Sequence, residues 1–141
     1  MKSPAELTEL FRAQGLKVTP QRQCIFRALH GNDQHPTAEA IHERVTAEMP
    51  TVSLRTVYQT LHDLADMGEL VELDLGTGSG RFDPNLEPHQ HLVCNECGRV
   101  FDVVVDVSTI GKPRLAHGFR VDRTEVVFRG RCRACSAAAG N

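Results

Sequence analysis

Four of the five cysteines fall into two pairs of identical spacing. Cys94 and Cys97 form one CxxC pair, and Cys132 and Cys135 form the other, whereas Cys24 stands alone. Two such pairs can deliver four thiolates to one tetrahedral zinc ion, with Zn–S distances of about 2.3 Å. Because four sulfur ligands leave no open position for a substrate, the expected ion is structural and its binding energy contributes to folding.

A redox dithiol is the alternative use of these cysteines, with one pair active and the other incidental. It is the less favoured interpretation because neither pair has the strand-then-helix context of a thioredoxin motif. Cys24 lies on the apolar stripe of a predicted helix, which indicates a buried small hydrophobic residue rather than a sensor.

Histidines and aspartates form a second group of potential ligands, without sulfur. His89 and His91 make an HxH motif on a predicted strand, so both imidazoles face the same side. Asp83 precedes the motif, and Asp102 lies in the strand that follows it. His35, in the turn before a predicted helix, completes the group. Three imidazoles and two carboxylates suit Fe(II) or Mn(II) as well as Zn(II), and metal availability partly decides which ion binds.

The same residues raise an alternative from another functional class. A zinc hydrolase would use the HxH motif and the carboxylates around an open coordination position. It is less favoured because no general base is evident outside the ligand set. His30, His42 and His62 are interpreted as ordinary surface or core rings. The sequence leaves open whether His117 belongs to a further metal site.

Helices are expected to dominate the first half of the chain. Apolar residues recur with helical spacing, and Thr or Ser stands at the start of three of these segments, where an N-cap is expected. The first predicted helix covers 5–14, the second begins at Thr19 and Pro20, the third runs from Thr37 to about Met49, and the fourth runs from Ser53 to Gly68.

A short hairpin is predicted after these helices. ELVELDL alternates as a strand over 69–75, GTGSG forms a turn and RFD resumes the second strand. Helices followed by such a hairpin are the outline of a winged helix-turn-helix, which docks its recognition helix in the major groove of DNA.

The fourth predicted helix has the two faces that a recognition helix needs. Arg55 is suited to guanine, Gln59 to adenine and Tyr58 to a thymine methyl. Hydroxyls on this helix and groups at the start of the second helix are suited to phosphate. A merely solvated polar face is the alternative, which the element order disfavours. The candidate DNA contacts are Lys17, Thr19, Arg22, Ser53, Arg55, Thr56, Tyr58 and Gln59.

The composition changes after about Pro84. Strands are expected at HQHLVC and RVFDVVV, followed by a helix across 107–117 and an alternating strand over 119–130. The CxxC pairs bracket this small α/β unit, and the tail SAAAGN is expected to be disordered. The fold class is therefore α+β, with domains at 1–84 and 85–141.

Overall composition restricts the broad class. The 141 residues are 24% charged and 40% hydrophobic, which is typical of a soluble globular protein. The net charge of −2 gives no global argument for nucleic acid, although five basic and two acidic residues leave the first thirty positions basic. No apolar run approaches the roughly 20 residues of a membrane span, and no signal-peptide core is present, so the expected compartment is the cytoplasm.

With these residues in view, the chain resembles the ferric uptake regulator (Fur) family. The resemblance extends from LKVTPQR through HPTAEAIHERV, VSLRTVYQTLHDL, RFD and HQHLVCNECGRVFD to GRCRAC. It implies a repressor that binds palindromic, AT-rich DNA as a homodimer, through an N-terminal winged helix and a C-terminal dimerisation and metal-binding domain. It also implies that the four paired cysteines hold structural zinc.

Within the family the chain resembles the peroxide-sensing (PerR) branch. The positions that match its regulatory site read His35, Asp83, His89, His91 and Asp102, whereas iron-sensing members usually carry glutamate at the two aspartate positions. The PHQH segment also lacks the extra histidine and aspartate of another metal site.

The resemblance implies a mechanism for sensing. One Fe(II) or Mn(II) ion ties the two domains together and fixes the recognition helices for a palindromic operator. With Fe(II), hydrogen peroxide oxidises His35 and His89 and releases the DNA; with Mn(II), repression persists. The alternative within the family is an uptake regulator for iron, manganese or zinc without peroxide chemistry. No other small-molecule substrate and no membrane partner are expected.

Overall fold

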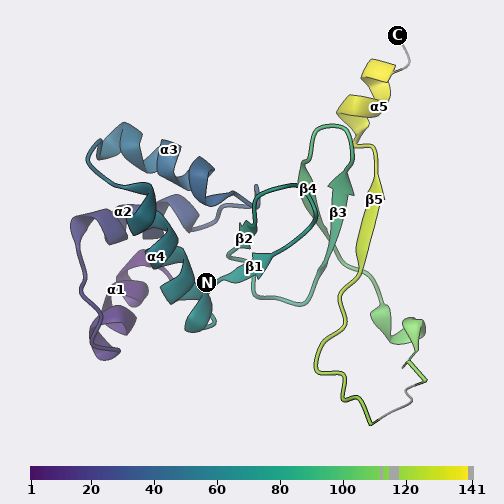
Figure 1. Ribbon diagram of the computed structural model, residues 1–141, viewed down its shortest axis with the longest axis horizontal. Coiled ribbons are helices and arrows are strands. Elements are labelled where there is room, and N and C mark those ends of the chain that lie inside the picture. Colours follow the sequence, from purple (N-terminus) through teal and green to yellow (C-terminus); the bar gives the residue numbers. More distant parts are fainter. Residues whose placement is uncertain (112, 115–117, 140–141) are drawn as a thin grey trace. The chain divides into compact units, whose positions relative to one another are not determined.

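The computed structural model describes residues 1–111, 113–114 and 118–139. The chain divides into two units, Met1–Leu86 and Glu87–Asn141. The first contains helices and a two-stranded sheet, and the second contains a three-stranded mixed sheet and a short helix (Figure 1). The fold class is therefore α+β, as the sequence predicts. No helix within the described part of the chain combines the length and apolar character needed to cross a membrane.

The predicted helices of the first unit are confirmed. Hydroxyl side chains cap all of them: Ser3 and Glu6 form a capping box, and Thr19, Thr37 and Ser53 each accept a hydrogen bond from a backbone N–H three residues later. The helices are α1 (Pro4–Ala13), α2 (Pro20–Leu29), α3 (Ala38–Glu48) and α4 (Leu54–Asp66).

The four helices bury a common apolar core. Phe11 of α1 packs edge-on against Phe26 of α2, with ring centroids 4.9 Å apart. The apolar stripe predicted on α4 is buried at Val57, Leu61 and Leu64. This burial fixes which face of α4 turns inward and leaves Arg55, Gln59 and His62 exposed.

The hairpin is present but shorter than predicted. Strands β1 (Val71–Leu73) and β2 (Arg81–Asp83) pair antiparallel, with Val71 opposite Asp83. The turn begins early because the Asp74 carboxylate accepts a hydrogen bond from the Gly76 N–H. The Phe82 N–H of β2 donates to the Pro36 carbonyl oxygen, which ties the hairpin to the loop before α3.

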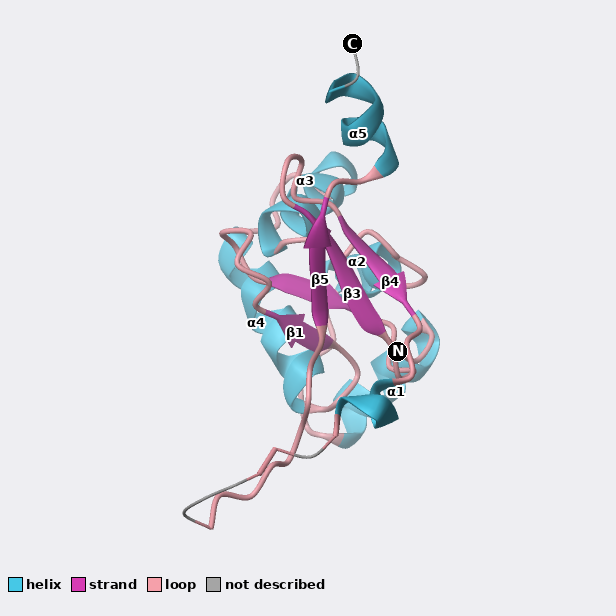
Figure 2. Ribbon diagram, turned by 90° about the vertical axis from the view of Figure 1, so that its right-hand side faces the viewer, coloured by secondary structure: helices cyan, strands magenta, loops and turns pink. Residues whose placement is uncertain are grey.

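The second unit is built around a central strand, β3 (Gln90–Cys94). Strand β4 (Val100–Val103) pairs antiparallel with one edge of β3, and β5 (Val127–Gly130) pairs parallel with the other (Figure 2). In this register His91 lies opposite Asp102.

Three expectations for the second unit are wrong in the described residues. The helix expected over 107–117 is a 3-10 turn, η1 (Val107–Ile110), because Gly111 follows at φ 73° and Pro113 disfavours helix before it. His117 lies outside the described residues. The strand expected over 119–130 shortens to β5, because 119–126 finds no strand partner. Residues 136–139 of the tail expected to be disordered belong to α5 (Arg133–Ala139), in which alanines favour helix, and 140–141 lie outside the described residues.

Candidate metal centres and nucleic-acid interface

The four paired cysteines converge within the second unit. Cys94 ends β3, Cys97 lies in the turn before β4, Cys132 follows β5 and Cys135 lies in α5. Their sulfur atoms all lie within 4.8 Å of one another. The Sγ atoms of Cys97 and Cys132 are 3.8 Å apart, and a zinc tetrahedron with Zn–S bonds of about 2.3 Å separates its sulfurs by about the same distance.

Backbone contacts hold the two cysteine pairs together. The Asn95 N–H donates to the Gly130 carbonyl oxygen at 2.8 Å, which joins the first CxxC turn to the end of β5. The Cys132 N–H donates to Cys94 Sγ at 3.3 Å. The parallel pairing of β3 with β5 therefore places both pairs at one end of the sheet, and all four cysteines carry free thiols.

The environment shifts the pKa values of Cys94 and Cys135 in opposite directions. Backbone N–H groups of Cys97 and Cys132 lower the pKa of Cys94 to about 6. Hydrogen bonding to Cys132 and Cys97 raises the pKa of Cys135 to about 12. Sulfurs packed this closely cannot all become thiolates without a cation among them, so the donor chemistry fits a divalent metal ion.

Cys24 lies apart from this cluster, in α2 of the first unit. Its side chain is buried in the helical core, and burial raises the pKa of its thiol. The prediction of a buried small hydrophobic residue is confirmed.

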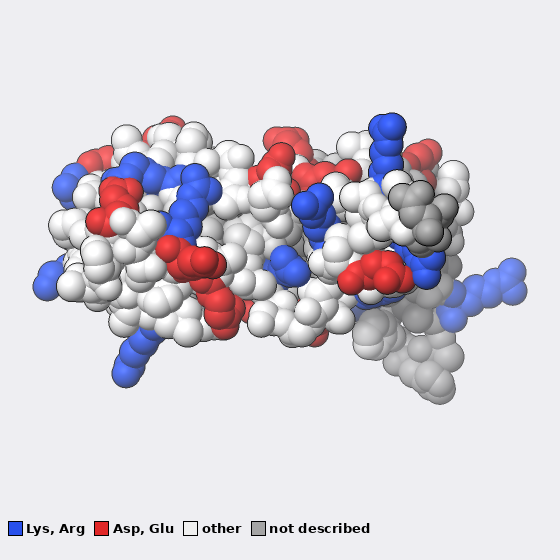
Figure 3. All heavy atoms as spheres, turned by 90° about the horizontal axis from the view of Figure 1, so that it is seen from above, with Lys and Arg blue, Asp and Glu red and all other residues white. Residues whose placement is uncertain are grey.

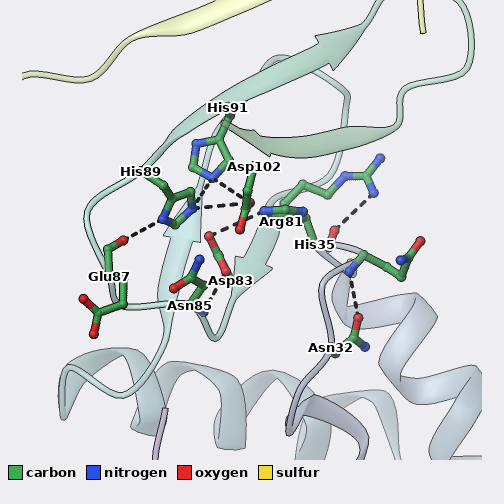
Figure 4. A network of polar contacts seen from close by, with 10 residues as sticks. Asn32, His35, Arg81, Asp83, Asn85, Glu87, His89, His91 and Asp102 are labelled. Carbon is green, nitrogen blue, oxygen red and sulfur yellow. Dashed lines mark hydrogen bonds and ion pairs between the residues drawn. The ribbon is translucent and has the colours of Figure 1, made fainter. Parts of the chain in front are cut away.

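His35 and Asp83 meet within the first unit (Figure 4). Both side chains are buried, and His35 Nε2 lies 3.5 Å from Asp83 Oδ2. The other carboxylate oxygen of Asp83 accepts a hydrogen bond from the Asn85 N–H at 2.8 Å, which orients Oδ2 toward the ring. Arg81 donates to the His35 carbonyl oxygen at 3.2 Å.

The backbone of His35 is strained. Among the residues that the structure describes, His35 is the non-glycine residue with a positive φ, 48°. Such a conformation costs about 1–3 kcal/mol and persists where the surroundings impose it, which is common at functional sites. Here the Arg81 contact and the hydrogen bond between Phe82 and Pro36 hold the loop in place.

His89, His91 and Asp102 meet within the second unit (Figure 4). The Nε2 atoms of the two histidines are 3.0 Å apart, and Asp102 Oδ1 lies 3.4 Å from His89 Nε2 and 4.0 Å from His91 Nε2. The cross-strand pairing of His91 with Asp102 produces this arrangement. Two nitrogens bound at right angles to one metal at about 2.1 Å are about 3.0 Å apart, so the spacing suits chelation.

A backbone contact selects the tautomer of His89. Its Nδ1 lies 2.7 Å from the Glu87 carbonyl oxygen, which can only accept a hydrogen bond. Nδ1 therefore carries the proton, and Nε2 of the neutral ring presents a lone pair toward His91 and Asp102. Metal-binding histidines are commonly oriented in this way.

The predicted DNA contacts lie at the N-terminal ends of α2 and α4 in the first unit. Arg55 is exposed and forms no ion pair with any residue that the structure describes. Lys17 is exposed, while the capping roles of Thr19 and Ser53 make their hydroxyls part of the helix starts. The Thr56 hydroxyl lies 3.0 Å from that of Ser53.

Three of these predicted contacts are already engaged by carboxylates. Tyr58 donates to Glu39 at 2.9 Å, and this hydrogen bond raises the pKa of the phenol. Gln59 and Arg22 both donate to Asp63. Sequence reasoning missed Glu39 and Asp63 as partners. The spacing of four between Gln59 and Asp63 could have indicated that pair, whereas nothing local links Glu39 to Tyr58.

Charge differs between the units. Residues 1–86 carry eight basic and twelve acidic side chains, a formal charge of −4, whereas 87–141 carry eight basic and six acidic ones, a charge of +2. On the face drawn in Figure 3, Lys and Arg side chains are interspersed with Asp and Glu rather than gathered in one patch. The first unit as a whole therefore carries no net positive charge that would attract DNA phosphates.

Comparisons with known proteins agree with one another. The model of the ferric uptake regulator family matches residues 13–129. A peroxide-responsive repressor, PerR, of Staphylococcus aureus is 40% identical over 91 residues, which cover 64% of this chain and 62% of the relative. The match thus spans less than two thirds of that relative's length.

Solved structures extend the similarity over most of the chain. PerR from Streptococcus pyogenes, solved in work on peroxide sensing and gene regulation, is 30% identical, with 96% of this chain and 94% of that chain covered and a TM-score of 0.55. A zinc-bound manganese uptake regulator is 28% identical, with 93% and 99% covered and a TM-score of 0.71.

Proposed function

Because the chain belongs to the ferric uptake regulator family, we propose that it is a metal-dependent transcription repressor that binds palindromic, AT-rich duplex DNA as a homodimer in the cytoplasm. The family consists of transcription regulators and not of enzymes, so the hydrolase interpretation is abandoned. One observation carries the proposal: a single chain presents an all-thiolate donor set and a separate set of imidazoles and carboxylates.

The thiolate set is assigned to structural zinc. Cys94, Cys97, Cys132 and Cys135 would hold the ion, and their spacing and chemistry fit it without any further ligand. Zinc would supply charge neutralisation and cross-linking here. The residues themselves join the start of β4 and the end of β5 to the central strand.

The imidazole and carboxylate donors are assigned to one regulatory Fe(II) or Mn(II) ion. His35 with Asp83, and His89 and His91 with Asp102, each form an incomplete donor set for these metals. Sharing one ion would couple the helical unit to the second unit. To convert a 1:99 equilibrium into 99:1, the ion must favour the binding-competent state by about 5.5 kcal/mol.

The proposal also names the signal that the repressor senses, which is hydrogen peroxide. For each H2O2 consumed, one imidazole, at His35 or His89, would be oxidised: a ring C–H bond is replaced by a bond to one peroxide oxygen, and the other oxygen leaves as water. The net electrons would come from the imidazole, with the bound iron promoting cleavage of the O–O bond, and the oxidised ring would be a poorer metal ligand. The similarity to the peroxide-responsive repressor of Staphylococcus aureus supports this assignment.

Parallel DNA-binding measurements test the proposal. Protein loaded with Fe(II) or Mn(II) is bound to an AT-rich palindromic duplex, and anisotropy is read before and after a low dose of peroxide. We expect release from the iron form alone, with a gain of one oxygen on peptides containing His35 or His89. Fragment ions that locate the added oxygen distinguish His35 from the nearby His30, and His62 serves as a second internal control. Iron-loaded protein that releases DNA without that mass gain would refute the role of these histidines.

An uptake regulator without peroxide chemistry is the second candidate. The similarity to a zinc-bound manganese uptake regulator favours it. Metal-specific DNA binding that survives peroxide in both the iron and the manganese forms would select this function over peroxide sensing.

A further inference from the structure

The two carboxylate oxygens of Asp63, on α4, have different side-chain partners. Its Oδ1 accepts a hydrogen bond from Gln59 Nε2 at 2.9 Å, and its Oδ2 forms an ion pair with Arg22 Nη2 at 2.8 Å. One carboxylate thus contacts a side chain of the predicted recognition surface and a side chain of α2. The Asp63 and Arg22 side chains are only 14% and 15% exposed, which strengthens their attraction relative to a surface pair.

Arg22 is itself held on several sides. Its Nη1 donates to the Lys17 carbonyl oxygen at 3.2 Å, and its guanidinium lies 5.2 Å from the centroid of the Phe11 ring. These contacts fix Arg22 between α1, the loop before α2, and α4. Because the guanidinium is fixed, it fixes Asp63 in turn.

The contact with Asp63 determines which way the Gln59 amide faces. A carboxylate only accepts hydrogen bonds, so the NH₂ group of Gln59 must point toward Asp63 and the amide oxygen must point elsewhere. Reading adenine requires the NH₂ group and the oxygen of Gln to be presented together in a defined order. The second N–H and the oxygen of Gln59 are therefore presented in one orientation.

We propose that Asp63 is a positioning residue that orients the Gln59 amide for base recognition, with Arg22 holding Asp63 in place. The inference rests on the proposed DNA-binding function. It gives Arg22 a role in positioning beyond the phosphate contact expected from sequence. Asp63 itself touches no base, and its effect is confined to the base pair that Gln59 reads.

The test compares Asp63→Asn with Asp66→Asn in the full-length, zinc- and Mn(II)-loaded protein. Asp66 lies on the same helix and is exposed, so the two variants make the same change in charge. Wild-type protein first selects a duplex from a random pool, and single base-pair changes in that duplex are then measured by anisotropy. Gln59→Ala identifies the base pair that Gln59 reads.

We expect Asp63→Asn to reduce discrimination at that base pair at least about fivefold, with other positions and non-specific binding matching Asp66→Asn. The double variant Gln59→Ala/Asp63→Asn should discriminate no less than Gln59→Ala alone. Equal weakening at every position, or discrimination in Asp63→Asn equal to that in Asp66→Asn, would overturn the inference. If the wild-type protein selects no sequence at all, the proposed function fails instead.

Discussion

The two units of this chain are stabilised in different ways. The first has a continuous apolar core in which Phe11, Phe26, Leu61 and their neighbours are fully buried. In the second, the buried hydrophobic residues among those described are Val93, Cys94 and Val100. A unit with so little apolar burial needs another source of stability, and a structural metal or oligomerisation supplies it in many small domains.

The second unit also exposes apolar side chains on its sheet. Leu92 lies opposite Phe101 on one neighbouring strand and Phe128 on the other, and all three are about two-fifths exposed. An apolar sheet face of this kind suits the homodimer proposed above. The first unit therefore has an apolar core sufficient to order its helices, whereas we expect the second unit to depend on a bound metal or a partner chain.

The largest expected effect is the loss of zinc from the second unit. Cys132→Ser removes one of the four thiolates, so zinc content measured by atomic absorption should fall from one per chain toward none. Metal-binding free energies at such sites are of the order of 10 kcal/mol, so the second unit should unfold while the helical circular dichroism of the first persists. Cys24→Ala should retain its zinc. A Cys132→Ser protein with full zinc content would contradict the assignment.

A core substitution should instead destabilise the first unit and leave the zinc of the second unit in place. Leu61 is fully buried, so Leu61→Ala should lower the free energy of unfolding of the first unit by about 2–5 kcal/mol in urea titrations followed by circular dichroism. Zinc content should not change. Leu86→Ala, at a side chain 44% exposed, is the matched control. Release of zinc in parallel with the helical transition would show that the units do not unfold independently.

Local signals explain what the sequence could predict. Thr19 with Pro20, and Ser53, mark helix starts because a cap satisfies N–H groups within three residues, and CxxC spacing sets the distance between sulfurs without reference to the rest of the fold. The alternation in 119–126 was misleading for a related reason. Alternation describes a strand's two faces but does not supply a partner strand, and Arg120 instead pairs with Asp122 locally.

Contacts between distant residues could not be predicted. Arg22 and Asp63 are 41 residues apart, and Lys2 and Glu69 are 67 residues apart, so their pairing depends on how the helices pack. The same limit applies to the regulatory donors. Single-sequence reasoning named His35, Asp83, His89, His91 and Asp102, but the contact of Asp102 with the two histidines follows from strand register, which spacing alone does not specify.

The affinity for the proposed regulatory ion should depend on ligands from both units. Asp83→Asn in the first unit and Asp102→Asn in the second should each weaken Mn(II) binding at least about tenfold, measured by calorimetry on zinc-loaded protein. Zinc content should remain at one per chain in both variants. Asp106→Asn, at an exposed position in the second unit, is the control. Loss of Mn(II) affinity in only one of the two variants would indicate an ion held by a single unit and would break the shared-site proposal.

The smallest expected effect is on the pH dependence of the stability of the first unit, through Glu69. Glu69 is buried, which alone would raise its pKa, but hydrogen bonds from the Lys2 side chain and backbone N–H, with the nearby positive charges, hold the pKa below its ordinary value of 4.5. A lowered pKa in the folded state means that the contact stabilises the first unit above pH 4.5, and that this stabilisation is lost as the pH falls through the folded-state pKa.

Glu69→Gln should therefore lower the free energy of unfolding by about 1 kcal/mol at pH 7, because Lys2 is half-exposed. The difference from wild type should shrink toward pH 3.5. Glu9→Gln, at an exposed ion pair on α1, should change stability much less. A cost for Glu69→Gln that stays constant from pH 7 to pH 3.5 would mean that the carboxylate charge plays no part in holding the N-terminus to the start of the hairpin.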